Sequence, residues 1–142
     1  MDELSMPLSC STSCYFHGRL HSMKSAYRKL CEQESGRTLV DHLHIAGSFM
    51  ERAIGLLGRG YLDSNEGLWI APCSGIHTIG MRFPIDVLFL NRHGCALRVA
   101  PYVHPWRFCG PVRGARTVIE LPAGTIRRQN IRTGIHYVQS EK

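Results

Sequence analysis

Short runs of apolar residues, many of them alternating with polar ones, recur along this chain from about residue 37 onward. In residues 38–46, apolar side chains alternate with polar ones, which is typical of a strand with one buried face. Further strands are predicted at residues 67–70, 85–90, 95–99, 116–121 and 135–138, because these apolar runs are short and Gly, Pro, Asn or other polar residues flank them.

The pattern predicts little helix. Ser48 and Glu51 have the spacing of a capping box, in which the Ser oxygen accepts an early helix N–H and the Glu reaches back. Apolar residues follow at helical spacing up to Leu57, and Gly58 stands where a left-handed cap would be needed. Residues 125–130 are expected to form a polar turn or a single helical turn.

Several short strands without a regular βα alternation predict a mainly β fold, either a small antiparallel sandwich or a partly open barrel, with one short helix. We place this single β-rich domain at residues 37–142. Residues 1–36 are Ser-rich and are expected to be a poorly ordered N-terminal tail, with a short helix at 23–34 as its one structured element. Residues 100–115 hold several Pro and Gly residues and are expected to be one long loop.

Charge and cysteine usage narrow the functional classes. The net charge is +6 and comes from 14 Arg and 3 Lys against 11 acidic residues. Arg suits carboxylate and phosphate partners, but no basic run or basic helical stripe is present, so nucleic acid is not an expected partner. None of the six cysteines forms a Cys-x-x-Cys pair, which argues against zinc-ribbon and thioredoxin-like sites. The start is acidic and no apolar run could span a membrane, so we expect a cytoplasmic protein.

Two acidic residues lie inside predicted strands. Asp86 shares a strand face with Leu88 and Leu90, and the opposite face of that strand is also apolar, so burial on both sides is expected. Glu120 lies in a similar position. A buried carboxylate must find donors or shift its pKa upward. These two residues could hold loop N–H groups or arginines, with Arg82 and Arg116 as partners.

A functional alternative for the same residues is a polar pocket beside the loop at 73–84. This pocket would be built from His77, Arg82, Asp86 and Glu120.

The loop at 73–84 also carries Cys73, His77 and Met81 at intervals of four residues. This set could bind a transition metal, with His42 or His44 as a further ligand. Alternatively, Cys73 and His77 could act as nucleophile and base. The simplest interpretation is a loop Cys, a hydrogen-bonding His and a core Met.

Aromatic and basic residues meet again in the Pro-rich segment. Tyr102, His104, Trp106 and Arg107 could stack on a ring or hold an anion. They could also serve only to pack the loop against the domain.

Three motifs carry a family resemblance: Gly-Leu-Leu-Gly-Arg at 55–59, Met-Arg-Phe-Pro-Ile-Asp-Val-Leu-Phe-Leu at 81–90 and Val-Ile-Glu-Leu-Pro-Ala-Gly at 118–124. In this order they resemble domain-of-unknown-function family 192, over residues 37 to 138. The resemblance implies a compact β-rich domain. It implies no known activity, substrate or cofactor.

These observations lead to one main functional hypothesis. We expect a non-catalytic module that binds an anionic small molecule or a protein partner, through His77, Arg82, Asp86, Arg116, Glu120 and Trp106. A Cys/His-dependent enzyme or a metal protein that uses the 73–81 loop is the alternative.

Overall fold

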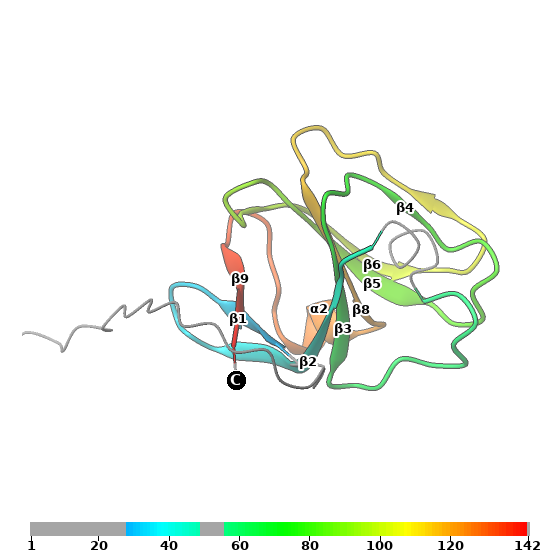
Figure 1. Cartoon of the computed structure of the whole chain (residues 1–142), viewed down its shortest axis with the longest axis horizontal. Coiled ribbons are helices and arrows are strands. Elements are labelled where there is room, and N and C mark those ends of the chain that lie inside the picture. The colour runs from blue at the N-terminus through cyan, green and yellow to red at the C-terminus, as the bar shows by residue number, and fades with distance from the viewer. Residues whose placement is uncertain (1–27, 49–55, 142) are drawn as a thin grey trace, which may run out of the picture.

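The computed structural model describes residues 28–48 and 56–141 (Figure 1). Seven strands form one sheet in the order β6-β5-β8-β3-β2-β1-β9. Their bounds are β1 (Arg28–Glu32), β2 (Thr38–Ala46), β3 (Glu66–Ile70), β5 (Ile85–Leu90), β6 (Ala96–Val103), β8 (Thr117–Pro122) and β9 (Tyr137–Ser140). A separate two-stranded ribbon joins β4 (Ile76–His77) to β7 (Phe108–Cys109), and α2 (Thr125–Arg128) is a single helical turn.

The seven-stranded sheet is antiparallel except between β2 and β3, which pair in parallel. Its two ends come together at one place. Cys95, just before β6, forms an isolated bridge with His136, just before β9. The Gly134 N–H donates to the carbonyl of Ala96 at 2.8 Å. The sheet therefore curls into a barrel that is not closed, which confirms the mainly β, partly open architecture.

Strands β5 and β8 are buried along their whole length. Inside the curl, Leu88, Ile119 and Leu121 pack with residues of β1, β2 and α2. On the outer side, a second apolar cluster includes Val87 and Phe89, and the segments around residues 56–62, 73–83 and 109–115 cover it. Burial on both faces of β5, predicted from its sequence, is confirmed.

The N-terminal part of the structure corrects one prediction. Residues Arg28–Glu32 form strand β1, which pairs with both β2 and β9, and not the second half of a helix at 23–34. Strand β1 thus lies ahead of residue 37, where the sequence analysis placed the start of the β-rich domain. These residues form a strand because β1 pairs with a neighbouring strand on each side, and this places Leu30, which is fully buried, in the barrel interior. The rest of the predicted tail, residues 1–27, lies outside the described residues.

The segment 100–115 is also less irregular than predicted. Strand β6 continues to Val103, and β7 follows at Phe108–Cys109. The prolines of this segment favoured a loop prediction. Pro101, however, is exposed on an edge strand, where the missing N–H need not break a hydrogen bond of the sheet. The helix predicted after Ser48 falls on residues 49–55, outside the described residues, although Gly58 has the expected positive φ of 84°.

Candidate functional site

A single buried threonine joins the two loops that the sequence singled out. The Thr78 hydroxyl donates to the carbonyl of His104 at 2.7 Å and accepts from the N–H of Arg107 at 2.9 Å. The Thr78 main chain also bonds to this loop: its N–H donates to the Arg107 carbonyl, and its carbonyl accepts from the N–H of Trp106. Thr78 is 0% exposed. The loop after β4 and the loop before β7 therefore behave as one unit, which we call the two-loop surface (residues 73–82 and 102–111).

A hollow lies on the two-loop surface beside the β4–β7 ribbon. It has a volume of about 330 Å³, and its walls include His77 and Phe108. The two rings meet edge to face with centroids 6.3 Å apart. Behind them the backbones approach closely, since a Cβ on Gly110 would lie 2.8 Å from the Cα of Gly75. Close backbone packing gives this hollow a firm base.

Large aromatic side chains stand exposed next to the hollow. Phe108 is 78% exposed and Trp106 is 64% exposed. Trp106 also holds a φ of 62°, and Tyr102 in the same segment holds 51°. Non-glycine residues adopt such angles at a cost of about 1 kcal/mol or more, and such conformations cluster at binding and active sites.

The charged side chains between residues 67 and 119 are almost all basic. Between residues 67 and 119 the one acidic side chain is Asp86, which is buried. The arginines of this stretch are Arg82, Arg92, Arg98, Arg107, Arg113 and Arg116, and all are exposed. The ion pairs found among the described residues involve none of them. Arg82 and Arg107 belong to the two-loop surface, whose residues 73–82 and 102–111 include no acidic side chain.

Asp86 is fully buried and has a structural connection to this surface. One carboxylate oxygen accepts the Tyr102 N–H at 2.9 Å, and the other accepts the Ile126 N–H at 2.7 Å. It therefore fixes the start of the aromatic loop and the first turn of α2 at the same time. The partner of Asp86 is backbone N–H, one of the options that the sequence left open, and not an arginine.

Glu120 has a different environment. It is 3% exposed, and its Oε2 has no hydrogen-bond partner among the described residues. Burial raises the pKa of Glu120 to about 7. Its neighbours across the sheet, Leu68 and Val87, are apolar.

The structure does not bring the predicted polar pocket together. Asp86 pairs with Leu121, whereas Glu120 pairs with Val87, so the two carboxylates point to opposite faces of the sheet. Arg82 and Arg116 are both exposed, and the Arg116 backbone serves a structural purpose, accepting the Cys73 N–H at 3.0 Å.

The Cys73–His77–Met81 set is dispersed as well. The Cys73 thiol donates to the carbonyl of Gly75 at 3.1 Å. Met81 is buried in the outer apolar cluster, whereas His77 is exposed against Phe108. Among residues 28–48 and 56–141, no group of three His, Cys, Asp or Glu side chains could hold a metal ion. No helix in the same residues is long and apolar enough to cross a membrane.

Two residues of the surface escaped the sequence analysis. Nothing in the sequence pointed to Thr78, because its hydroxyl bonds to backbone groups about 26 residues away along the chain. Phe108 was detectable as an aromatic residue close to Trp106 in a Pro-rich segment, and its pairing with His77 follows from the β4–β7 ribbon.

Comparisons with known proteins agree with this fold. The family model of DUF192, described as "Uncharacterized ACR", matches residues 30–137. The "UPF0127 protein PF1050" of Pyrococcus furiosus is 28% identical over 104 residues, which cover 70% of this chain and 87% of that protein.

Two crystal structures have the same fold. One is a protein of unknown function from Novosphingobium aromaticivorans, with a TM-score of 0.70 and 19% identity over 84% of this chain and 91% of that one. The other, from Sinorhizobium meliloti 1021, is described as a "putative transcription regulator" and has a TM-score of 0.67 and 21% identity over 83% of this chain and 98% of that one. The family match covers most of the chain and confirms the resemblance seen in its motifs; the protein belongs to the DUF192 family.

Proposed function

We propose that this domain is a non-catalytic binding module, and that its two-loop surface binds an acidic peptide segment of a partner protein. The observation that carries this proposal is the Thr78 network, because it fixes two segments distant in sequence into one exposed aromatic surface. Aromatic residues, including Trp and Phe, are enriched at protein interfaces, and Trp and Arg are enriched at binding hot spots.

The chemistry of the surface favours an acidic segment that also carries an apolar side chain. The hollow beside His77 and Phe108 can receive one apolar group. Arg107 is exposed beside Trp106, and its guanidinium bonds only to the Trp106 carbonyl among described groups, which leaves further N–H donors for a carboxylate. The lack of exposed acidic side chains between residues 67 and 119 adds long-range attraction.

The alternatives of an enzyme or a metal protein have less support. A nucleophilic Cys73 would need His77 as a base, but the thiol donates to a backbone carbonyl and the His77 ring packs on Phe108. We therefore do not assign catalysis to the 73–81 loop.

The test uses a blocked peptide that alternates Glu and Phe, and a second peptide in which Gln replaces Glu. We expect the Glu peptide to shift the backbone NMR signals of residues 74–78 and 104–110 and to bind more weakly as salt rises. A Trp106→Ala/Phe108→Ala double variant should lose at least about tenfold in affinity, which corresponds to about 1.4 kcal/mol.

Tyr61→Ala is the matched control, because Tyr61 is 74% exposed and lies outside the surface. Equal affinity of the Gln peptide, or unchanged binding by the double variant, would overturn the proposal. Tighter binding of duplex DNA than of the Glu peptide at the same salt concentration would also overturn it.

A further inference from the structure

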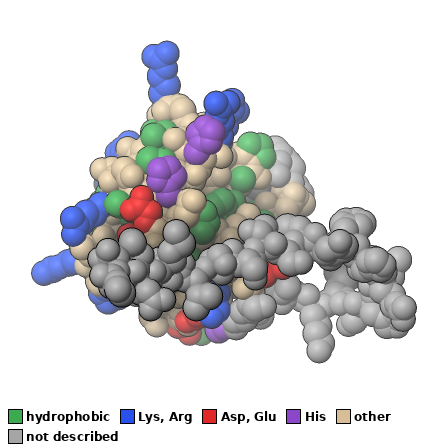
Figure 2. All heavy atoms as spheres, turned by 90° about the vertical axis from the view of Figure 1, so that its left-hand side faces the viewer, with side chains coloured by type: hydrophobic (Ala, Val, Ile, Leu, Met, Phe, Trp, Pro, Cys, Tyr) green, Lys and Arg blue, Asp and Glu red, His purple; other side chains and the backbone are tan. Residues whose placement is uncertain are grey.

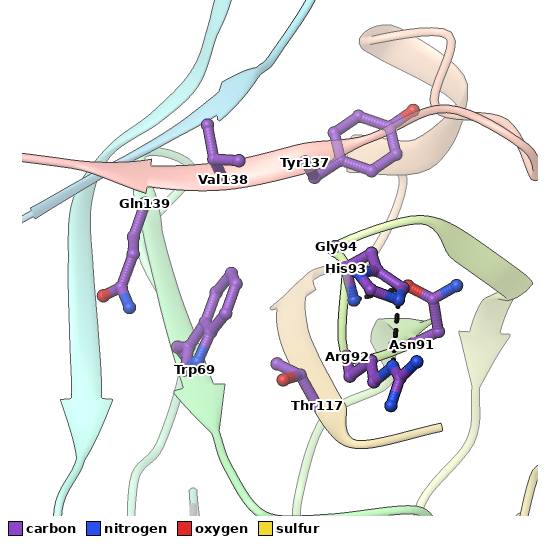
Figure 3. A pocket seen from close by; sticks show the side chains of 9 residues that line it. All are labelled: Trp69, Asn91, Arg92, His93, Gly94, Thr117, Tyr137, Val138 and Gln139. Carbon is purple, nitrogen blue, oxygen red and sulfur yellow. Dashed lines mark hydrogen bonds between the residues drawn. The ribbon is translucent and has the colours of Figure 1, made fainter. Parts of the chain in front are cut away.

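A second pocket lies at the place where the curled sheet fails to close (Figure 3). It has a volume of about 340 Å³. Its lining comes from β3, β8, β9 and the turn between β5 and β6: Trp69, Asn91, Arg92, His93, Gly94, Thr117, Tyr137, Val138 and Gln139. None of these residues belongs to the two-loop surface. Small-molecule sites are common at the mouths of β-barrels.

The inner wall of the pocket combines a flat apolar ring with the hydroxyl of a mostly buried threonine. Trp69 is half-buried and packs against the barrel core. Thr117 lies in the neighbouring strand β8 and is 8% exposed. Figure 3 shows both side chains at the pocket wall. The Thr117 hydroxyl can donate to or accept from a polar group that enters the pocket.

The turn at residues 91–94 gives the pocket a rigid rim. The Asn91 Oδ1 accepts the N–H groups of His93 at 2.8 Å and Cys95 at 3.0 Å. Gly94 has a φ of 83°, and a Cβ there would lie 2.7 Å from the Tyr137 carbonyl oxygen. Only glycine lets the turn approach β9 this closely.

The rim orients a positive charge. Arg92 donates through Nε to Nε2 of His93 at 2.9 Å, which leaves the terminal guanidinium nitrogens available (Figure 3). The terminal guanidinium N–H groups match a carboxylate in a bidentate arrangement. On the opposite side, Arg28 donates to Oε1 of Gln139 at 2.8 Å, so the Gln139 amide group is held in place.

The side of the molecule on which β1 and β9 lie carries both basic and acidic side chains (Figure 2). Figure 2 shows arginine or lysine and histidine side chains there, with hydrophobic side chains between them. The pocket lining itself includes Arg92 and no acidic side chain, which favours an anionic ligand over a cationic one.

We propose that this pocket binds a small aromatic carboxylate. The ring would lie against Trp69, the carboxylate would accept from Arg92, and Thr117 would bond to a polar substituent. Ligand pockets usually range from about 300 to 1,000 Å³, so this pocket suits a single ring with one acid group and not a dinucleotide.

The probe is benzoate, with uncharged benzamide as its counterpart. The Trp106→Phe background leaves Trp69 as the single tryptophan of the chain, so its indole N–H signal and fluorescence report on the pocket alone. We expect benzoate to shift the Trp69 signal with a Kd of about 1 mM or tighter, a reasonable affinity for a ligand of this size. Benzamide should bind about tenfold more weakly, because it cannot form the ion pair.

Two variants test the assigned contacts, and a third is the control. Arg92→Gln should weaken benzoate binding about tenfold and leave benzamide binding unchanged, whereas Thr117→Val should weaken salicylate, which carries a hydroxyl, more than benzoate. Arg113→Gln is the control, since Arg113 is exposed and does not line the pocket. Thermal unfolding of each variant verifies that it is folded. The proposal is wrong if benzoate at about 10 mM leaves the Trp69 signal unchanged, or if Arg92→Gln and Arg113→Gln bind benzoate equally.

Discussion

Asp86 and Glu120 lie on adjacent strands, and their side chains point to opposite faces of the same sheet. The Asp86 carboxylate accepts two backbone N–H groups, while the Oε2 atom of Glu120 has no partner among the described residues. The Asp86 carboxylate therefore ties two backbone segments together, whereas burial disfavours the charged form of Glu120. This difference leads to two separate predictions.

Replacing Asp86 should strongly destabilise the domain. An Asn side chain keeps one acceptor but turns an NH₂ group toward a backbone N–H, so at least one charge-assisted hydrogen bond is lost in a buried site. We expect Asp86→Asn to lower the free energy of unfolding by about 3 kcal/mol, measured by urea denaturation. Asp63→Asn is the control, because Asp63 is exposed. Similar stability losses for both variants would contradict the assigned function of Asp86.

Replacing Glu120 should have the opposite effect and raise the free energy of unfolding at high pH. Burial raises the Glu120 pKa from its ordinary 4.5 to about 7, so the folded state binds the proton more tightly than the unfolded chain does. The contribution of protonated Glu120 to the free energy of unfolding is fully present below about pH 4.5 and is lost as the pH rises through about 7. The full difference corresponds to about 3 kcal/mol.

Glu120→Gln removes the titrating group. We expect the variant to be more stable than the wild type at pH 8.5, with the difference shrinking between pH 7 and pH 5, as measured by thermal unfolding at each pH. Comparing the two proteins at equal pH cancels the contribution of other groups, including His44, whose pKa burial lowers. A stability difference that does not change with pH would contradict this account.

The Thr78 hydroxyl should contribute more to the free energy of unfolding than a surface hydroxyl does. In Thr78→Val the shape is kept, but the His104 carbonyl and the Arg107 N–H lose their bonds to the side chain. We expect a loss of about 2 kcal/mol in unfolding free energy and faster amide exchange at residues 104–107. Thr133→Val, at an exposed position, should change stability by less than about 0.5 kcal/mol. Unchanged exchange at 104–107 would show that Thr78 does not hold the loop.

Gly110 is predicted to tolerate no side chain. It has a φ of 100°, and a Cβ would lie 2.8 Å from the Cα of Gly75 and 2.9 Å from the Ser74 carbonyl oxygen. Both neighbours are backbone and cannot move away cheaply, so Gly110→Ala should cost about 3 kcal/mol or more in thermal or urea unfolding. Gly134→Ala separates the two causes, since Gly134 has a φ of 81° but open space around it. It should cost only about 1 kcal/mol, the strain of the backbone alone.

Local sequence pattern was enough to predict several of the strands. The alternation in residues 38–46 and the apolar runs at 85–90 and 116–121 predicted β2, β5 and β8 to within a residue, because burial on one or both faces dictates which side chains a strand can carry. The same logic predicted that Asp86 and Glu120 are buried, and the order of three motifs predicted the family.

Pairing between segments far apart in the chain decided the other features of the fold. Nothing local distinguishes Arg28–Glu32 from a helix, and these residues became a strand because β2 and β9 offer hydrogen bonds on both sides. The register between β5 and β8 alone places Asp86 and Glu120 on opposite faces. The sequence by itself determined the central strands β2, β5 and β8 and the burial of Asp86 and Glu120, since both depend on the side chains present. Only the tertiary structure decided which loops meet and where a pocket opens, because those depend on contacts between residues far apart in the chain, such as Thr78 with His104 and the 91–94 turn with β9.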